Sequence, residues 1–252
     1  MAKSFDRIAD KFDETRSYPD AIMSKIVDAV EKAMAPCASV LDDGVGTGRF
    51  AMPLQRRGFD VVGIDVARLM LQKAASKGVA GLVRGDACAL PFRDASFDYA
   101  LSVHLIHLIP TWRSALREVG RVTRTSLLSV VSDKGRSEAE EIRRMYAGTC
   151  KDLGFEVKHA GPMERELVDL IQPDSVSVIT VQEKAVDVGA LLHNYEARTF
   201  SEQWEVPDEV HSGAVQILKE RYEGIDSILS REEISLMVWS ADRIRGIGRP
   251  PA

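Results

Sequence analysis

The spacing of apolar residues changes at Pro36. Before it, Ile22, Ile26 and Val30 lie four residues apart, which is the spacing of one helix face. Helical structure is therefore predicted over residues 5–35, with Pro36 ending it. After Pro36 the apolar residues form short runs bounded by turns, which is the pattern of strands.

Seven apolar runs are predicted to be strands, with helices between most of them. The strands are expected at 39–41, 60–65, 79–84, 97–103, 126–131, 176–181 and 233–239. Helices are expected at 49–57, 69–76, 112–122, 138–153 and 162–171. Apolar strands that alternate with helices are typical of a parallel sheet covered on both faces, so the fold class is α/β.

A long helical stretch separates the last two predicted strands. It is rich in Glu, Arg and Leu, and a hairpin needs no connection of this length. We therefore expect residues 184–230 to be a helical insertion before the last strand, forming a small cap. Residues 1–183 and 231–245 are then expected to form the core domain.

The composition is that of an ordinary globular protein. Of 252 residues, 45% are hydrophobic and 28% are charged, which excludes general disorder. The net charge of −5 lacks the basic field of a dedicated nucleic-acid binder, so no nucleic-acid partner is expected. No apolar stretch reaches the roughly 18 residues of a membrane span. Charges in place of a signal segment, and three widely spaced cysteines, predict a cytoplasmic location.

A glycine-rich turn follows the first predicted strand. Gly44, Gly46 and Gly48 alternate with other residues between a strand and a helix. Glycines let the backbone approach a ligand, and the amides at the start of the helix point toward it. The same turn could also be a tight connection without a ligand.

Acidic residues end three successive strands. Asp42 precedes the glycines, Asp65 ends the second strand and Asp86 follows the third. Open α/β sheets bind their ligands at the edge where the carboxyl ends of the strands meet. Asp65 is placed to accept hydrogen bonds from ribose hydroxyls, and it could also cap the following helix.

Together these motifs resemble the class I S-adenosylmethionine-dependent methyltransferases, in particular the small-molecule group that includes ubiquinone and menaquinone biosynthesis enzymes. The matching segments are acid-x-Gly-x-Gly-x-Gly at 42–48, the acid at 65, Gly-Asp-Ala at 85–87, Leu-Pro-Phe at 90–92, Phe-Asp at 97–98 and the helix residues 117–122. The resemblance covers about residues 5–132. It implies a Rossmann-like sheet of seven mostly parallel strands and a site for S-adenosylmethionine or its product S-adenosylhomocysteine.

The resemblance also implies a role for each matching position. The turn with Gly44, Gly46 and Gly48 would hold the methionine part of the cofactor. Asp42 would reach its amino group, and Asp65 would bind the ribose hydroxyls. The remaining implied contacts are with the adenine for Val66, Met70, Asp86 and Ala87, and with the sulfonium end for Ser102 and Val103.

Asp43 departs from the family pattern. It stands where relatives usually carry an aliphatic residue, directly beside Asp42. Neighbouring carboxylates repel each other unless one points to solvent or is paired. Asp43 could also attract the sulfonium or amino charge of the cofactor. We expect it to be exposed or to act at a helix end, ahead of such a role.

His104 and His107 follow the fourth predicted strand and are candidates for a catalytic base. Neutral imidazole can take a proton from a hydroxyl or an amine. Either side chain could instead pack beneath the next helix. No third ligand stands at a metal-binding spacing, so no metal is expected.

Six further residues are candidates for a lid or for acceptor contacts. In the family that the chain resembles, a segment before the first strand often folds over the cofactor, and the insertion could line a substrate pocket. Each group could equally be ordinary packing. The candidates are Phe12, Arg16 and Tyr18 in the opening segment, and Tyr195, Arg198 and Trp204 in the insertion.

The function predicted from the sequence is transfer of a methyl group from S-adenosylmethionine to a small-molecule acceptor. The transfer is an SN2 displacement that works mainly through proximity and alignment. An RNA or protein methyltransferase is the alternative, disfavoured by the acidic balance. A non-catalytic cofactor-binding protein is a third possibility. The motifs do not indicate the acceptor, the methylated atom or the oligomeric state.

Overall fold

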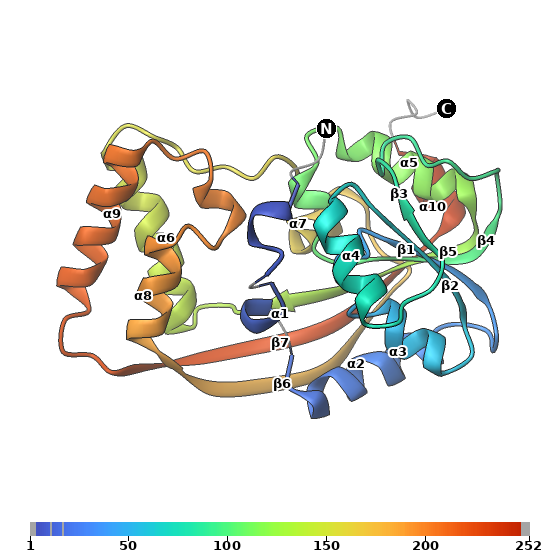
Figure 1. Ribbon diagram of the computed structural model, residues 1–252, viewed down its shortest axis with the longest axis horizontal. Helices are drawn as coiled ribbons and strands as arrows, with labels where there is room; N and C mark the ends of the chain where they lie inside the picture. The colour runs from blue at the N-terminus through green and yellow to red at the C-terminus, as the bar shows by residue number, and fades with distance from the viewer. Residues whose placement is uncertain (1–3, 11, 17, 248–252) are drawn as a thin grey trace. The chain divides into compact units, whose positions relative to one another are not determined.

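The computed structural model describes residues 4–10, 12–16 and 18–247 (Figure 1). Met1–Lys3, the first residues of the charged start, lie outside them. The strands form one seven-stranded sheet of order β3-β2-β1-β4-β5-β7-β6. Their bounds are β1 (Ser39–Asp43), β2 (Asp60–Asp65), β3 (Leu82–Arg84), β4 (Phe97–Ser102), β5 (Thr123–Asp133), β6 (Ser175–Asp187) and β7 (Ser227–Ser240).

The sheet is mostly parallel, as the sequence predicted. β1 to β5 pair in parallel, and β6 and β7 form an antiparallel hairpin. The α-helices are α1 (Phe12–Arg16), α2 (Asp20–Lys32), α3 (Ala51–Arg56), α4 (Arg68–Ser76), α5 (Trp112–Val122), α6 (Glu138–Asp152), α7 (Glu164–Leu170), α8 (Val188–Glu196), α9 (Asp208–Arg221) and α10 (Ala241–Arg245). Short 3-10 turns lie at η1 (Asp6–Ile8), η2 (Ile106–Leu108) and η3 (Ser201–Gln203).

Successive residues of the strands enter two different hydrophobic cores. Val40 and Leu101 belong to a core with α2 and α3, whereas their neighbours Leu41 and Ala100 belong to a core with α5 and α10. Side chains alternate between the two faces of a sheet, so both faces of these strands are buried under helices. The covered parallel sheet explains why the strands are apolar along their whole length.

Several predicted elements differ from the observed ones. The strands β6 and β7 are longer than the predicted ranges 176–181 and 233–239 and extend into the predicted helical insertion 184–230. Helical structure over 5–35 is interrupted, because Pro19 disfavours helical backbone at Tyr18 and is the N-cap of α2, which begins at Asp20. The third strand begins at Leu82 and not at Val79. The amide of Val79 donates to the carbonyl of Ala74 at the end of α4, which keeps Val79 out of the strand.

Contacts within the chain divide it into two units. The sheet unit comprises Met1–Val131, Ala160–Thr180 and Ile234–Ala252, and the helical unit comprises Ser132–His159 and Val181–Glu233. The helical unit has its own core, in which Tyr146 of α6, Tyr195 of α8 and Leu218 of α9 are buried together. The helical unit thus contains α6 in addition to the segment 184–230 proposed as an insertion.

Candidate active site

The glycine turn after β1 has the backbone of a ligand-binding loop. Gly44, Gly46 and Gly48 have φ angles of 80°, 56° and 79°, in the left-handed region that favours glycine. A Cβ atom on Gly48 would lie 2.5 Å from a methyl carbon of Val79, so this position is closed to other residues. A Cβ atom on Gly46 would meet nothing closer than Met70 Cε at 3.4 Å. The turn is therefore packed tightly at Gly48, whereas a Cβ atom on Gly46 would make only ordinary van der Waals contacts.

Asp65 joins this turn to the start of α4. Its Oδ2 accepts a hydrogen bond from the amide of Gly46 at 2.9 Å, and its Oδ1 accepts one from the amide of Ala67 at 2.8 Å. The second bond is the helix-end role that the sequence allowed. Burial raises the pKa of Asp65, and the two amide bonds counteract part of this rise. The same carboxylate thus fixes the turn and lies at the edge where a ribose was predicted.

Asp42 and Ser102 are buried at the same edge of the sheet and have polar atoms left over. Each is 3% exposed. Asp42 Oδ2 and Ser102 Oγ find no hydrogen-bond partner in the described part of the chain. Burial raises the pKa of Asp42 to about 7, and the positive charge of Arg49 limits this rise. These buried polar atoms without a hydrogen-bond partner indicate that a ligand could bind at this edge.

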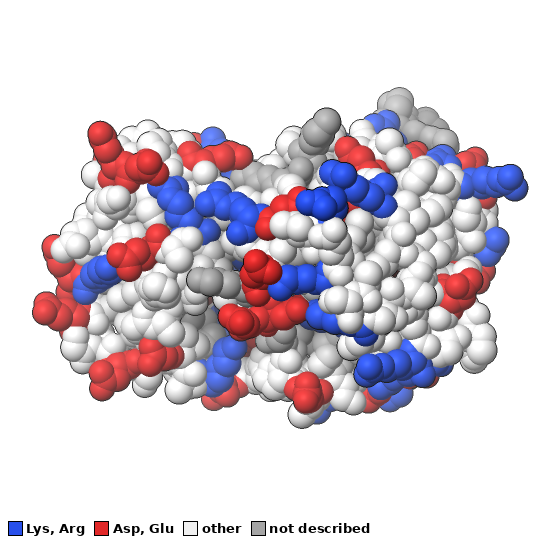
Figure 2. All heavy atoms as spheres, in the orientation of Figure 1, with Lys and Arg blue, Asp and Glu red and all other residues white. Residues whose placement is uncertain are grey.

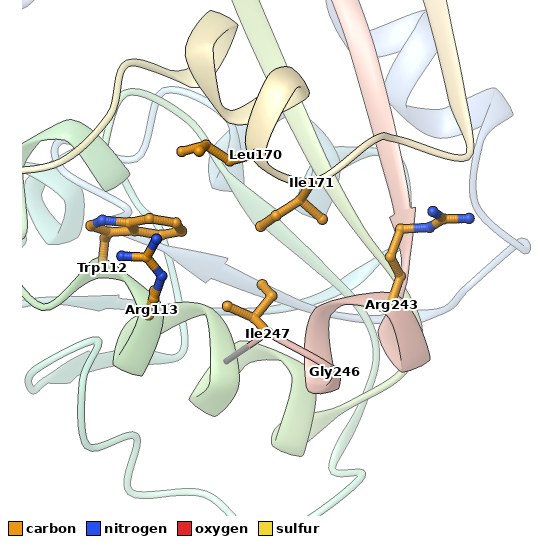
Figure 3. Close-up of a pocket in the computed structure, with 7 residues that line it drawn as sticks. All are labelled: Trp112, Arg113, Leu170, Ile171, Arg243, Gly246 and Ile247. Carbon is orange, nitrogen blue, oxygen red and sulfur yellow. The ribbon is translucent and has the colours of Figure 1, made fainter. Parts of the chain in front are cut away.

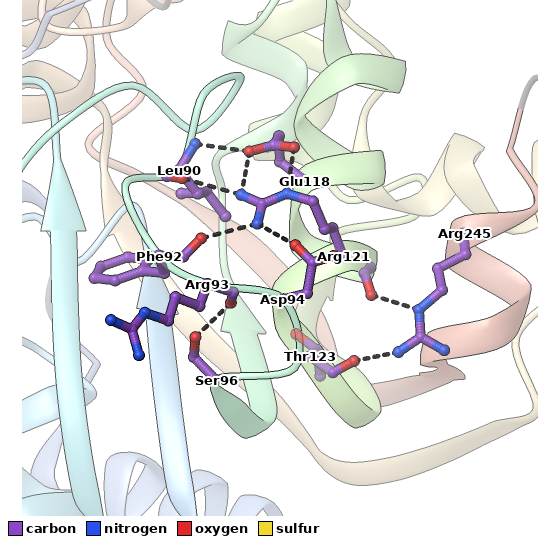
Figure 4. Close-up of polar contacts among 10 residues, drawn as sticks. Leu90, Phe92, Arg93, Asp94, Ser96, Glu118, Arg121, Thr123 and Arg245 are labelled. Carbon is purple, nitrogen blue, oxygen red and sulfur yellow. Dashed lines mark hydrogen bonds and ion pairs between the residues drawn. The ribbon is translucent and has the colours of Figure 1, made fainter.

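Helix α5 holds the loop that follows β3 at Leu90 and Phe92 (Figure 4). The guanidinium of Arg121 donates to the carbonyls of Leu90 and Phe92, at 3.0 and 2.8 Å, and pairs with Glu118. Glu118 in turn accepts from the amide of Leu90 at 2.9 Å.

At the start of the same loop, Asp86 accepts from the amide of Cys88 at 2.9 Å. Behind α5, Arg245 of α10 donates to the carbonyls of Gly120 and Thr123 (Figure 4). The motif residues Glu118 and Arg121 therefore fix the loop at Leu90 and Phe92, a few residues after the third strand-end acid.

The opening segment is tied to the glycine turn by side chains that the sequence motifs did not reveal. Thr47 Oγ1 donates to Asp13 of α1 at 2.6 Å, and Lys77 Nζ lies 2.5 Å from the other oxygen of Asp13. Arg49 donates to the carbonyl of Arg16 at 2.6 Å and lies over the ring of Tyr18, 5.2 Å from its centroid. These partners are far apart in sequence, which is why no local pattern predicts them.

The other residues of the opening segment and of the adenine prediction also lie in the sheet unit. Phe12 and Phe5 contact edge to face at 5.9 Å and pack against a small cluster that contains Met70 and Ala67. Met70 is 2% exposed. Met70 therefore lies close to both Phe12 and the glycine turn.

The expectation that Asp43 is exposed or acts at a helix end is wrong. Asp43 is the last residue of β1 and is 0% exposed. Burial, followed by the negative charges of Asp42, Asp65 and Asp86, raises its pKa to about 8. Its position in a strand covered on both faces decides its burial, whatever its polarity.

The two candidate histidines differ in their surroundings. His107 Nδ1 lies 3.3 Å from Oε1 of Glu164 at the start of α7. Burial would raise the pKa of Glu164, but the contact with His107 lowers it to about 2. His104 has a φ of 56°, and burial lowers its pKa to about 4 despite the nearby charge of Glu164. His104 is therefore neutral and weakly basic near pH 7, whereas His107 has a carboxylate that orients it.

The three lid candidates in the helical unit take part in its own packing. Tyr195 is 2% exposed, and its ring lies 5.1 Å from that of Tyr146. Arg198 donates to the carbonyls of Gln203 and Val206, and the indole of Trp204 donates to the carbonyl of Arg198 at 2.9 Å. Ordinary packing, the alternative considered from the sequence, describes these contacts.

A separate pocket of about 360 Å³ lies in the sheet unit at one end of α5 (Figure 3). None of the residues proposed for the cofactor lines it. Arg113 lies over the ring of Trp112 at 4.1 Å, and Arg243 is paired with Asp174. Its lining residues are Trp112, Arg113, Leu170, Ile171, Arg243, Gly246 and Ile247.

Within the described residues, no cluster of three or more His, Cys, Asp or Glu side chains is arranged to hold a metal ion. Among the helices described, none is long and apolar enough to cross a membrane. On the face drawn in Figure 2, Lys and Arg side chains lie among Asp and Glu side chains and form no continuous basic field.

The fold and the glycine turn with its strand-end acids are those of a class I S-adenosylmethionine-dependent methyltransferase domain. Residues 41–126 match the family described as a methyltransferase domain. The matched segment begins in β1 and ends in β5, so it contains all the predicted cofactor residues.

Curated relatives and a solved structure agree with this assignment. The chain is 30% identical over 156 residues to a demethylmenaquinone methyltransferase of Staphylococcus aureus strain MRSA252, which covers 58% of this chain and 62% of that protein. It is 29% identical over 148 residues to the biotin biosynthesis bifunctional protein BioHC of Cellvibrio japonicus, covering 58% of this chain and 29% of that protein. The chain thus spans less than two thirds of the length of these relatives.

The solved structure is the YcgJ protein from Bacillus subtilis. It superposes with a TM-score of 0.57 at 17% identity and covers 88% of this chain and 99% of that one. At this identity the similarity shows the fold alone.

Proposed function

We propose that the protein transfers a methyl group from S-adenosylmethionine to a small-molecule acceptor. The observation that carries the proposal is the row of Asp42, Asp65 and Asp86 along the carboxyl edge of the sheet, beside a left-handed glycine turn. A buried polar atom without a partner costs about 1–3 kcal/mol, and Asp42 Oδ2 and Ser102 Oγ are such atoms. A ligand that pairs with them offsets this cost.

The residues present fit this cofactor. The left-handed glycine turn lets a methionine chain approach the backbone, and Asp42, whose Oδ2 is buried and unbonded, is assigned to its ammonium group. Asp65 has charge and lone pairs for two ribose hydroxyls in addition to its two amide bonds. The remaining assignments are to the adenine for Val66, Met70, Asp86 and Ala87, and to the sulfur end for Ser102 and Val103.

Most of the catalysis assigned to the chain is positioning. When bound, the cofactor supplies an electrophilic methyl group on a sulfonium leaving group. Asp65 holds the turn rigid, and the contact of Asp13 with Thr47 keeps α1 against that turn, where it limits the access of water. Fixed alignment of two reactants supplies up to about 7–11 kcal/mol of the barrier reduction, so few dedicated catalytic groups are needed.

His107 is the stronger of the two candidates for a proton acceptor. Glu164 is ionised near pH 7, and its hydrogen bond with Nδ1 of His107 holds the orientation of the imidazole ring. This base is needed only for an acceptor that must lose a proton, such as a hydroxyl. The low pKa of His104, about 4, makes it the weaker base.

A small acceptor is favoured over a nucleic acid. The net charge is −5, and the demethylmenaquinone methyltransferases among the relatives are named for a small substrate. We assign the choice of acceptor to the segment 184–230, which lies outside the matched domain and shares a hydrophobic core with α6. More specifically, we propose an acceptor of the menaquinone type.

Calorimetry with S-adenosylhomocysteine and a labelled-methyl assay on metabolite fractions test the proposed function. The wild type should bind the product, and Gly46→Ala should bind it about five- to thirtyfold more weakly, because holding an alanine in the left-handed backbone of the binding turn costs about 1–2 kcal/mol. Gly148→Ala is the matched control, since a Cβ atom there meets nothing within 4 Å. Absence of product binding by the wild type would refute the proposal. Binding without transfer of the labelled methyl group to any metabolite fraction would indicate a non-catalytic cofactor-binding protein.

Acceptor selection is tested by replacing 188–226 with a short turn. Because α8 and α9 cover Ile142 and Tyr146 of α6, the variant also carries Ile142→Gln and Tyr146→Gln. Product affinity should stay within a few fold while transfer to the natural acceptor is lost. Full activity of a folded variant, or loss of cofactor binding, would contradict this role.

A further inference from the structure

The buried carboxyl group of Asp43 is a feature that the proposed function does not use. Asp43 ends β1, directly before Gly44, and its register partners are Ile64 of β2 and Ser102 of β4. Because side chains alternate along strands, register partners of a parallel pair share a face of the sheet. Asp43 and Ser102 are therefore neighbouring polar side chains at the edge that carries the glycine turn.

Both side chains are buried and incompletely bonded. Asp43 is 0% exposed and Ser102 is 3% exposed. Neither oxygen of the Asp43 carboxyl group, nor Ser102 Oγ, has a hydrogen-bond partner among the residues that the structure describes. Buried polar atoms in folded proteins are nearly always bonded, so three unbonded atoms at one place indicate a missing ligand.

The charges around Asp43 decide which ligand group fits. After burial, the largest influences on its pKa are the negative charges of Asp42 on its own strand, Asp65 on β2 and Asp86 after β3. Together they raise this pKa to about 8. A further anion would be repelled from such a place, whereas a cation would be attracted and would let Asp43 ionise.

The nearby basic side chains do not supply that cation. Arg49 acts on Asp42 and bonds the carbonyl of Arg16, and His104 is neutral near pH 7 because burial lowers its pKa to about 4. A metal ion would need further ligands, and the described residues include no group of three suitable side chains. The ligand group that remains is an organic cation.

We propose that Asp43, with Ser102 beside it, recognises the positive charge of the methyl donor and makes the site prefer S-adenosylmethionine to S-adenosylhomocysteine. This inference rests on the proposed function, which places the cofactor at the glycine turn. The two ligands differ by one methyl group and one positive charge on sulfur, and a carboxylate attracts only the charged form. Asp43 releases its proton to solvent when the donor binds, and takes a proton back from solvent once the neutral thioether remains. The site thereby limits inhibition by its own product.

Calorimetry with both ligands on the full chain at about pH 7.5 tests this preference. Asp43→Asn keeps the shape of the side chain and removes its charge. The ratio of the product Kd to the donor Kd should fall at least about tenfold in this variant, with product affinity within a few fold of wild type. Asp60→Asn is the control, because Asp60 is an exposed acid at the opposite end of β2 and its loss should leave the ratio unchanged.

Asp43→Leu repeats the test in case the amide does not fold, since an aliphatic residue suits the buried position. Wild-type titrations in two buffers of different ionisation enthalpy add a second readout, in which donor binding should release more protons than product binding. An unchanged ratio in a folded Asp43 variant, or equal proton release with the two ligands, would overturn the inference while leaving the proposed function intact. Failure of the wild type to bind either ligand would instead refute the proposed function.

Discussion

Asp65 is predicted to contribute both to the stability of the fold and to cofactor affinity. Both contributions can be measured on the variant Asp65→Ala. The substitution leaves the amides of Gly46 and Ala67 without their acceptor. Two hydrogen bonds of about 0.5–1.5 kcal/mol each predict a loss of about 1–3 kcal/mol in the free energy of unfolding. For a chain of this size the melting temperature should fall by about 2–12 °C. The fold should survive because the strand itself remains buried.

The affinity of the folded Asp65→Ala variant for the cofactor product should also fall, because the ribose hydroxyls lose their predicted acceptor. Each ribose hydrogen bond to a charged group contributes about 1.5–3 kcal/mol, so the loss of one such bond already weakens binding about tenfold. Asp65→Asn retains one acceptor oxygen and should lie between Asp65→Ala and wild type. Asp60→Ala at the other end of β2 is the control. Calorimetric titration of the folded variants with S-adenosylhomocysteine measures the effect, and wild-type affinity in folded Asp65→Ala would refute the ribose assignment.

Three further predictions follow from the site. With a hydroxyl acceptor, His107→Gln should lower turnover by about 10²–10⁴-fold and change cofactor affinity little, whereas His104→Gln should lower turnover less. A chelator should leave the rate unchanged. A loss of cofactor binding in either variant would indicate a structural role. Asp43→Leu should stabilise the ligand-free protein, and more at pH 8 than at pH 5. The raised pKa of Asp43 means that its stabilising contribution, present below about pH 4, is lost as the pH rises toward 8; a gain independent of pH in thermal melts would contradict this. Asp13→Ala should weaken product binding about two- to tenfold by releasing α1 from Lys77, and unchanged affinity would exclude that role for α1.

The periodic parts of the chain were predictable because their pattern is local. The bounds of β2 and α5 agree with the predicted ranges 60–65 and 112–122, since each is an apolar run or an amphipathic segment with clear ends. The strand-end acids could also be identified from the sequence, because the position of an acid after a strand is enough to place it at the carboxyl edge. The roles of the individual site residues are predictions that measurements of ligand binding by the variants test.

The sequence by itself determined a mostly parallel sheet, its glycine turn and the edge at which a ligand would bind. Only the tertiary structure decided that Asp43 is buried, that Asp13 meets Thr47 and Lys77, and that α6 packs with α8 and α9. The physical reason is that a sequence pattern states which face a residue takes on its own element. Burial and pairing depend on which other elements cover that face, and those elements come from distant parts of the chain.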